Sequence, residues 1–281
     1  MTQQATTATD DLAAADRELK AKHRGMWALG NYPAVASDII PSMGPVLVAA
    51  AGIGPGTRVL DVAAGSGNVA VPAALAGAEV IASDLTPDLL AAGRWAAQAA
   101  GANLTWQEAD VEALPYADGQ FDAVVSSVGI MFAPHHQRAA DETLRVTRPG
   151  GTIAIASWTP QGFIGQMFAT MKPYVAPPPP GAQPAPLWGS EDHVRELFGD
   201  RVTGLTFERR DIVVDHFDTG AEFRDYFKDN YGPTIAAYRG LSDSPDRAAS
   251  LDAELAALGD RGLDPNGTMR WEYLVVTAHK A

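Results

Sequence analysis

The sequence contains no cysteine among its 281 residues. A thiol nucleophile, a disulfide framework, a zinc–thiolate site and an iron–sulfur cluster are therefore all excluded. Basic residues are also scarce, because 21 Lys and Arg face 34 Asp and Glu and give a formal net charge of −13. A surface of that sign repels polyanions, so a protein that binds nucleic acid or an anionic membrane is disfavoured.

Long apolar runs are absent as well. None approaches the roughly 18 residues that a membrane-spanning helix needs. The first eleven residues lack the basic start and the apolar centre of a signal peptide, so we expect a cytoplasmic protein. Hydrophobic residues make up 46% of the chain and charged residues 20%, which is typical of a folded globular protein. The length fits one large or two small domains.

The middle of the chain alternates between short apolar runs and helical stretches. Five runs are predicted to be strands of a parallel sheet with right-handed crossovers: Arg58–Val62, Glu79–Ser83, Asn103–Gln107, Phe121–Val128 and Thr152–Ser157. Two later runs, 202–215 and 271–279, alternate partially and are expected to form an antiparallel pair at the sheet edge. The sequence therefore predicts an α/β fold with a Rossmann-like, seven-stranded, mostly parallel sheet.

Helices are predicted on both sides of this alternation. Residues 1–11 show no apolar period and are expected to be a tail, and the remainder of residues 1–52 is expected to be a helical cap. The core is expected to span residues 53–281. Helical insertions are predicted at about residues 160–200 and 217–268, over the carboxyl ends of the strands.

A glycine-rich turn follows the first strand. Gly65 and Gly67 carry no side chain there, so backbone N–H groups and a helix N-terminus can approach a ligand closely. Asp84 ends the second strand, where an α/β nucleotide fold places the carboxylate that binds two ribose hydroxyls, and Asp110 follows the third. These positions predict a nucleotide-type ligand. In the alternative reading, the glycines only make a tight turn and Asp84 caps the next helix.

A nicotinamide dinucleotide is one alternative for this turn. Gly65, Gly67 and Ala70 fit the spacing Gly-x-Gly-x-x-Ala that admits a pyrophosphate. Asp61 lies at the entrance of the same turn, however, and its carboxylate would repel a pyrophosphate and attract a cationic amine. The pocket therefore favours a cationic amino-acid nucleoside over a dinucleotide.

The segment 59–68, VLDVAAGSGN, resembles the first motif of the class I S-adenosylmethionine-dependent methyltransferases. It is closest to the ubiquinone/menaquinone-biosynthesis-like group, which tolerates Ala63 at the first glycine position. The resemblance continues in order through residues 82–86, 110–115, 121–124 and 145–151. It implies S-adenosyl-L-methionine as cofactor and S-adenosyl-L-homocysteine as product.

The resemblance also implies which residues hold the cofactor. Asp61 is implied to face the methionine amine, Asp84 to bind both ribose hydroxyls and Asp110 to accept from the adenine amino group. The remaining implied contacts shape the pocket floor, the adenine face and edge, and the surroundings of the sulfonium: Ala63, Gly65, Gly67, Leu85, Val111, Ser127 and Val128.

Two adjacent histidines follow the fourth strand. A histidine there can accept a hydroxyl proton near neutral pH, so His136, and next to it His135, are candidate general bases. In the alternative reading, the pair merely starts a helix with one ring packed and one solvated. The other histidines, His23 among them, are predicted to be structural or exposed. No spacing of His, Asp and Glu indicates a metal site.

Aromatic residues are concentrated in the cap and the insertions. Trp27 and Tyr32 are predicted to belong to an N-terminal lid, and Trp158 and Tyr226 to contact the substrate. Tyr226 lies on an aromatic helical face that fits core packing equally well. The N-terminal helices and the proline-rich connector 177–186 are expected to order when ligands bind, because a sulfonium must be shielded from water.

These observations lead to one functional hypothesis and two alternatives. The favoured function is methyl transfer to a small, apolar or aromatic molecule, at oxygen in preference to carbon or nitrogen. The alternatives are a cofactor-dependent reaction without transfer, such as cyclisation on the same fold, and a non-catalytic binding module. The sequence indicates neither the acceptor nor the oligomeric state.

Overall fold

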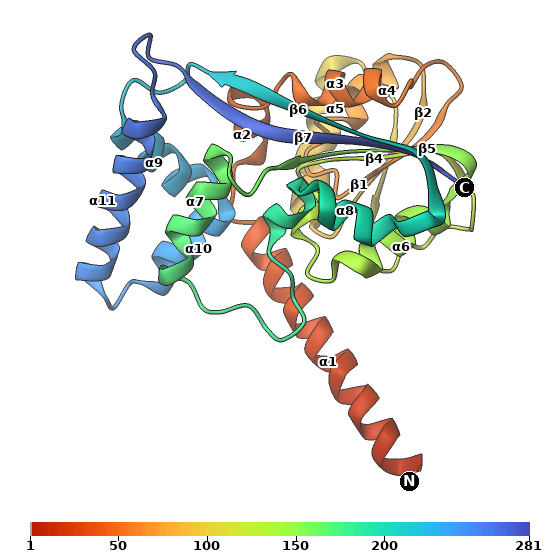
Figure 1. Ribbon diagram of the computed structural model, residues 1–281, viewed down its shortest axis with the longest axis horizontal. Coiled ribbons are helices and arrows are strands. Elements are labelled where there is room, and N and C mark those ends of the chain that lie inside the picture. The colour runs from red at the N-terminus through yellow and green to blue at the C-terminus, as the bar shows by residue number, and fades with distance from the viewer. Residues whose placement is uncertain (1) are drawn as a thin grey trace.

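A seven-stranded sheet forms the centre of the protein, in the order β3-β2-β1-β4-β5-β7-β6 (Figure 1). The computed structural model describes residues 2–281, with side chains described from residue 14 onward. The strands are β1 Arg58–Val62, β2 Glu79–Asp84, β3 Thr105–Glu108, β4 Phe121–Ser127, β5 Thr147–Trp158, β6 Val202–Val214 and β7 Met269–Lys280. Strands β1 to β5 pair in parallel, and β7 lies antiparallel between β5 and β6. The predicted sheet and its antiparallel edge pair are confirmed.

Helices cover both faces of the parallel part, as right-handed crossovers require. The crossover helices are α4 Ala70–Leu75, α5 Pro87–Ala100 and α6 His136–Val146. In Figure 1, α4 and α5 lie on one side of the sheet and α6 on the other. Four of the five β1 residues are consequently buried, and α5 begins with Pro87 at its first position, where proline is favoured.

Strand β5 is longer than expected. The sequence predicts that it starts at Thr152, but pairing to β4 begins at Thr147. Phe121 pairs with Thr147 and Ala123 pairs with Thr152, so the extra residues form a bulge. Gly150 lies in that bulge at φ 71°, a conformation that glycine adopts without a steric penalty. Gly150 therefore marks a bulge within β5.

Three helices precede the sheet: α1 Thr2–Trp27, α2 Tyr32–Asp38 and α3 Met43–Ala50. The prediction of a tail over residues 1–11 is wrong for the backbone from Thr2 onward, because the segment has no glycine or proline to stop a helix that propagates from its neighbour. Pro41 lies in the break between α2 and α3. Among the described residues no single helix is long and apolar enough to cross a membrane, and only α2 with α3, bent by 76°, passes that test as a pair.

The second insertion supplies α9 Gly220–Asn230, α10 Gly232–Gly240 and α11 Pro245–Gly262, which gather with α7 Phe163–Met171 at one end of the sheet (Figure 1). Trp271 of β7 joins this helical group to the sheet, stacking on Phe163 at 5.3 Å and packing against Phe223 and Phe227.

The elements of the first insertion lie in two different places in the fold. After α7 come the 3-10 turns η2 Lys172–Tyr174 and η3 Ala185–Gly189, then α8 Glu191–Phe198 and η4 Gly199–Arg201; a further turn, η1 Ile130–Phe132, follows β4. The prediction that residues 160–200 lie over the strand ends is wrong for α8, because α8 packs against α6 on a face of the sheet. Its apolar side chains Val194, Leu197 and Phe198 are buried there.

Candidate active site

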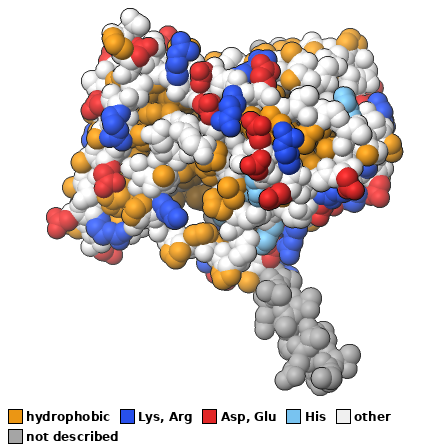
Figure 2. Space-filling model, in the orientation of Figure 1, with side chains coloured by type: hydrophobic (Ala, Val, Ile, Leu, Met, Phe, Trp, Pro, Cys, Tyr) orange, Lys and Arg blue, Asp and Glu red, His pale blue; other side chains and the backbone are white. Residues whose placement is uncertain are grey.

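The main pocket lies where the carboxyl ends of β1, β2 and β4 meet the N-terminal helices. Its sheet wall consists of the loops that follow these strands and β3: Ala63–Ser66, Asp84, Leu85, Ala109–Val111 and Ser127–Gly129. Its volume, including the solvent-filled space at its open mouth, is about 1250 Å³. In Figure 2, apolar side chains gather in the hollowed part of the visible face, between the helical group and the sheet. Ligands of α/β proteins bind at this edge of a sheet.

Backbone strain is concentrated at this wall. Ala63 (φ 50°) and Val128 (φ 44°) are the non-glycine residues with positive φ in the described chain, and both line the pocket. Such conformations cost on the order of 1–3 kcal/mol each and persist where the surroundings impose them. Gly129 shows the constraint, because a Cβ there would come within 2.1 Å of the Ala63 carbonyl oxygen. The loops after β1 and β4 thus pack backbone against backbone beneath the ligand space.

The two glycines of the first turn have different roles. Gly65 lines the pocket at φ 56°, and a Cβ there would meet nothing within 4 Å, so its backbone faces open space. Gly67 is not among the lining residues. A Cβ at Gly67 would lie 2.6 Å from the Trp106 ring, so this glycine makes room for an aromatic side chain. The implied role of Gly67 in the pocket floor is therefore corrected to packing.

Asp84 presents a fixed carboxylate to the pocket. Its Oδ2 accepts from the Gly65 N–H at 2.8 Å and its Oδ1 from the Thr86 N–H at 2.8 Å. Burial raises the pKa of Asp84, and the N–H groups of Thr86 and Gly65 oppose that rise by stabilising the ionised form. A carboxylate offers about four acceptor positions, so two remain for ligand hydroxyls.

Asp61 lies beneath the wall and not in it. Its Oδ2 accepts from the Ala70 N–H at 2.9 Å, at the start of α4. Its Oδ1 is buried and has no hydrogen-bond partner in the described part of the chain. Burial raises the pKa of Asp61 well above its ordinary value. A buried acceptor without a partner calls for a donor such as a water or an amine.

Asp110 and Val111 line the pocket after β3, beside a lysine that sequence reasoning did not single out. Asp110 Oδ1 accepts from the Glu112 N–H at 2.9 Å, and its Oδ2 contacts the Lys20 ammonium group. Lys20 lies on α1, and His23 and Trp27 line the pocket from the same helix. The spacing of His23 and Trp27, four residues apart, was the available signal that the two share one helical face.

The histidines after β4 lie outside the pocket lining. His136 is fully buried, with its Nδ1 2.9 Å from His193 Nε2 and its ring against Trp188. Burial, together with the neighbouring His193, lowers the pKa of His136 to about 4. His135 Nδ1 lies 2.9 Å from Glu112 Oε2. The geometry thus gives no support to the expectation that either is a general base, whereas His23, predicted to be structural, lines the pocket.

Three potential metal ligands nevertheless converge beside this wall. Asp16, Glu112 and His135 each place a ligand atom within 4.8 Å of the others. The three residues are far apart in the sequence, so their spacing did not predict this cluster. Lys20 already places its ammonium nitrogen 2.9 Å from Glu112 Oε2 and 3.3 Å from Asp16 Oδ2. The structure therefore shows a cluster in which lysine supplies the positive charge.

The opposite wall of the pocket is aromatic. Trp27, Tyr32 and Trp158 line it, as predicted, together with Phe132, Phe227, Tyr231 and Trp271. Tyr226 does not, because its hydroxyl donates to Asp38 Oδ2 at 3.0 Å. The Tyr32 oxygen accepts from the Gly232 N–H at 3.2 Å, which leaves the Tyr32 O–H available as a donor. No lining residue comes from the connector 177–186.

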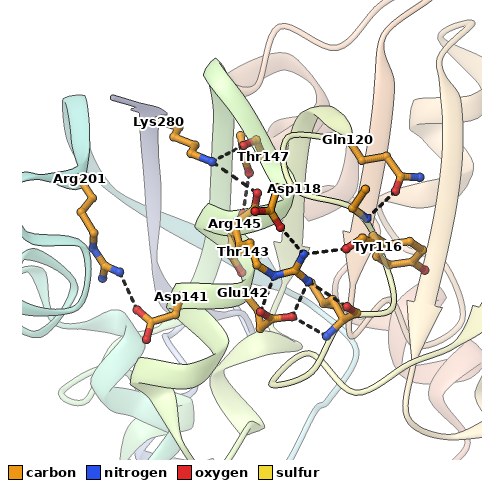
Figure 3. Close-up of polar contacts among 12 residues, drawn as sticks. Tyr116, Asp118, Gln120, Asp141, Glu142, Thr143, Arg145, Thr147, Arg201 and Lys280 are labelled. Carbon is orange, nitrogen blue, oxygen red and sulfur yellow. Dashed lines mark hydrogen bonds and ion pairs between the residues drawn. The ribbon is translucent and has the colours of Figure 1, made fainter.

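A polar network steadies the segment that leads away from Asp110 and Val111 (Figure 3). Arg145 of α6 donates to the carbonyl oxygens of Leu114 at 2.9 Å and Tyr116 at 2.7 Å. Glu142 pairs with Arg145 at 2.7 Å and accepts from the Leu114 N–H at 2.7 Å. The implied motif at residues 145–151 thus holds the chain behind the pocket and contributes no residue to its lining.

Comparisons with known proteins agree with this geometry. A family profile described as a methyltransferase domain matches residues 60–155. An uncharacterized protein of Mycobacterium tuberculosis is 52% identical over 271 residues, which are 96% of this chain and 98% of the relative. A demethylmenaquinone methyltransferase of Renibacterium salmoninarum is 38% identical over 131 residues, 44% of this chain and 53% of the relative.

A solved structure extends the likeness to the fold. A putative methyltransferase from Bacillus halodurans superposes with a TM-score of 0.57 at 18% identity, covering 85% of this chain and 99% of that one. At this identity the likeness concerns the arrangement of the sheet and its helices.

Proposed function

The chain belongs to the class I S-adenosylmethionine-dependent methyltransferases of the ubiquinone/menaquinone-like group, and from that premise we propose that it methylates a small, apolar or aromatic molecule. The observation that carries the proposal is a pocket with two unlike walls. One wall presents polar groups at strand ends, and the other presents aromatic rings. A cofactor on the first wall faces an acceptor on the second.

The residues present fit S-adenosylmethionine. Open space above Gly65, the fixed carboxylate of Asp84 and the unpartnered Oδ1 of Asp61 match a ribose and an amino group. When bound, the cofactor supplies an electrophilic methyl group. We propose that Asp84 binds the ribose hydroxyls and that Asp61 receives the amine, directly or through water.

The rest of the sheet wall completes this assignment. Asp110 and the Val111 N–H are proposed to contact the adenine edge, with Leu85 against its face. Ser127 and Val128 are proposed to border the reacting end, because they lie at the carboxyl end of β4, next to the loop after β1. The buried Ser127 hydroxyl has no hydrogen-bond partner in the described part of the chain.

The acceptor end supports a neutral, apolar substrate. The lining residues that carry a charge or an imidazole, Lys20, His23, Asp84 and Asp110, lie at the α1 edge of the aromatic wall and in the sheet wall. The rest of the aromatic wall offers hydroxyl and indole groups and no carboxylate or ammonium. Large apolar side chains with few polar groups favour a ring-bearing or aliphatic ligand over a charged one. Holding such an acceptor against the sheet wall supplies proximity and excludes water, which is the main requirement of a displacement reaction.

We propose His23 as the group that accepts the proton released in O-methylation. It lines the pocket on α1, one helical turn from Trp27. Burial lowers the pKa of His23, so its imidazole is neutral near neutral pH and can take a hydroxyl proton. This replaces the expectation for His135 and His136.

Transfer of a labelled methyl group tests the function. The purified chain would be incubated with deuteriomethyl-labelled S-adenosylmethionine and a panel of phenols, catechols, naphthols and quinols, followed by mass spectrometry. The expected result is one labelled methyl group on a panel member and an equal amount of S-adenosylhomocysteine. An acceptor that rearranges without gaining methyl would instead show a cyclase-type reaction, and methyl found only on amines or carbon would contradict the O-methylation proposal.

A further inference from the structure

Helix α1 and the segment after β3 carry complementary charges. Lys20 and Arg24 lie one turn apart on α1. Facing them, Glu108, Asp110 and Glu112 alternate along the segment that leaves β3. Arg24 contacts Glu108, and Lys20 contacts Asp110 and Glu112, the latter at 2.9 Å. Two basic side chains thus fasten the helix to the end of the strand.

Lys20 is the inner of these two contacts. Its side chain is 13% exposed and that of Glu112 is 1% exposed, whereas Arg24 and Glu108 are nearly half exposed. Glu112 also accepts from the His135 N–H at 2.7 Å, so its carboxylate cannot turn to solvent easily. Removing one member of a buried pair leaves its partner charged and without compensation, whereas an exposed pair contributes little.

Lys20 also reaches the proposed adenine contact. Its ammonium group touches Asp110, and both residues line the pocket. The same helix places His23 and Trp27 farther along the pocket. When Lys20 is paired, α1 therefore closes the pocket from the adenine end to the aromatic wall.

We propose that Lys20 is a positioning residue: by pairing with Asp110 and Glu112 it latches α1 over the pocket and sets how fast the cofactor enters and leaves. The proposal rests on cofactor binding at the sheet wall and is independent of the acceptor's identity. Because the latch is ionic, salt weakens it and speeds exchange, but less than it would for an exposed pair, since the Lys20 contacts are shielded from solvent.

The matched substitutions are Lys20→Gln and Lys22→Gln. Lys22 lies on the same helix and, among the side chains that the structure describes, pairs only with Glu18, with both side chains about 70% exposed. Dissociation of S-adenosylhomocysteine is followed by stopped-flow displacement in EDTA, so that no divalent cation replaces the ammonium among Asp16, Glu112 and His135. Lys20→Gln is expected to raise the dissociation rate constant about tenfold, Lys22→Gln less than about twofold, and Lys20→Arg to restore most of the loss.

Two further readouts separate a latch from a purely structural role. Hydrogen exchange is expected to quicken in α1 of Lys20→Gln and to stay unchanged in the strands. For the unsubstituted chain, raising the salt concentration from about 0.05 to about 1 M is expected to speed dissociation, and this needs no variant to fold.

Equal dissociation rates for the two glutamine variants would overturn the latch, as would a salt-independent rate in the unsubstituted chain. Tighter and faster binding by Lys20→Gln would also overturn it, because Lys20 would then be an obstruction. Failure of S-adenosylhomocysteine to bind the unsubstituted chain would overturn the cofactor assignment on which the latch depends.

Discussion

The two walls of the pocket differ in how their residues are brought together. Every lining residue of the sheet wall lies between Ala63 and Gly129, at the ends of strands that pair in parallel. The aromatic wall draws on residues from Lys20 to Trp271, on α1, α2, η1, β5, α7, α9 and β7 and between α9 and α10. Local strand–turn–helix rules build the first wall, and long-range packing builds the second.

The walls also differ in what holds them. The sheet wall depends on backbone hydrogen bonds to Asp84 and on strained backbone at Ala63 and Val128. The aromatic wall depends on contacts between rings, such as Trp27 with Phe132 and Trp27 with Tyr32, whose ring centroids lie 4.6 Å and 5.7 Å apart. This difference is the reason for the proposal that the polar wall holds the cofactor and the aromatic wall holds the acceptor.

The largest effect is expected from a substitution of His23, which tests whether the aromatic wall takes part in the chemistry. His23→Gln is expected to lower turnover about 100-fold, the lower end for loss of a general base. Since burial lowers the pKa of His23, turnover of the unsubstituted chain should be flat at neutral pH and fall as the pH drops through that lowered value. The control is His279→Gln, on the exposed end of β7. A parallel loss in both variants, or a pH profile unchanged by His23→Gln, would contradict the role.

A smaller loss is expected from Asp84→Ala, which addresses the sheet wall alone. Removal of hydrogen bonds to a charged group should weaken S-adenosylhomocysteine binding by about 1.5–3 kcal/mol. Calorimetry measures this, with Asp88→Ala, exposed on the first turn of α5, as the control. An unchanged dissociation constant in a folded Asp84→Ala protein would mean that the ribose is held elsewhere.

The smallest effect is expected from Tyr32→Phe, which separates the walls most cleanly. The variant keeps the ring against Trp27 and removes the hydroxyl, which accepts from the Gly232 N–H and can donate to a bound acceptor molecule. Acceptor KM should rise by about fivefold, the equivalent of about 1 kcal/mol, while cofactor affinity stays the same. A drop in cofactor affinity with unchanged acceptor KM would reverse the assignment of Tyr32.

The sheet wall could be predicted from the sequence, because each of its residues follows a recognisable strand. Strand β1 has the predicted bounds, and Asp84, Asp110 and Ser127 line the pocket as expected. One position there differs from the expectation, because Gly67 packs on Trp106 and is absent from the pocket lining. The oxygens of Asp61 lie beneath the wall, and its proposed contact with the amine stays a prediction. Spacing along a turn does not show which side of the backbone faces the ligand.

The aromatic wall could be predicted only in outline. Trp27 and Tyr32 were expected to cover the site, but Lys20 and His23 were not, since their partners lie far along the chain. His135 and His136 follow the right strand and still turn toward Glu112 and His193. Tyr226 shares a helical face with ring-packing residues and bonds to Asp38 outside the pocket. Such contacts depend on how α6, α8 and α9 pack, which no local pattern encodes.

A crystal structure of the complex with S-adenosylhomocysteine tests the division between the walls most directly. The account predicts both ribose hydroxyls at the Asp84 carboxylate, adenine beside Asp110 and Leu85, and the sulfur next to Ser127 and Val128, turned toward Trp27 and Tyr32. A complex with adenine among the aromatic rings, or with the ribose away from Asp84, would contradict it.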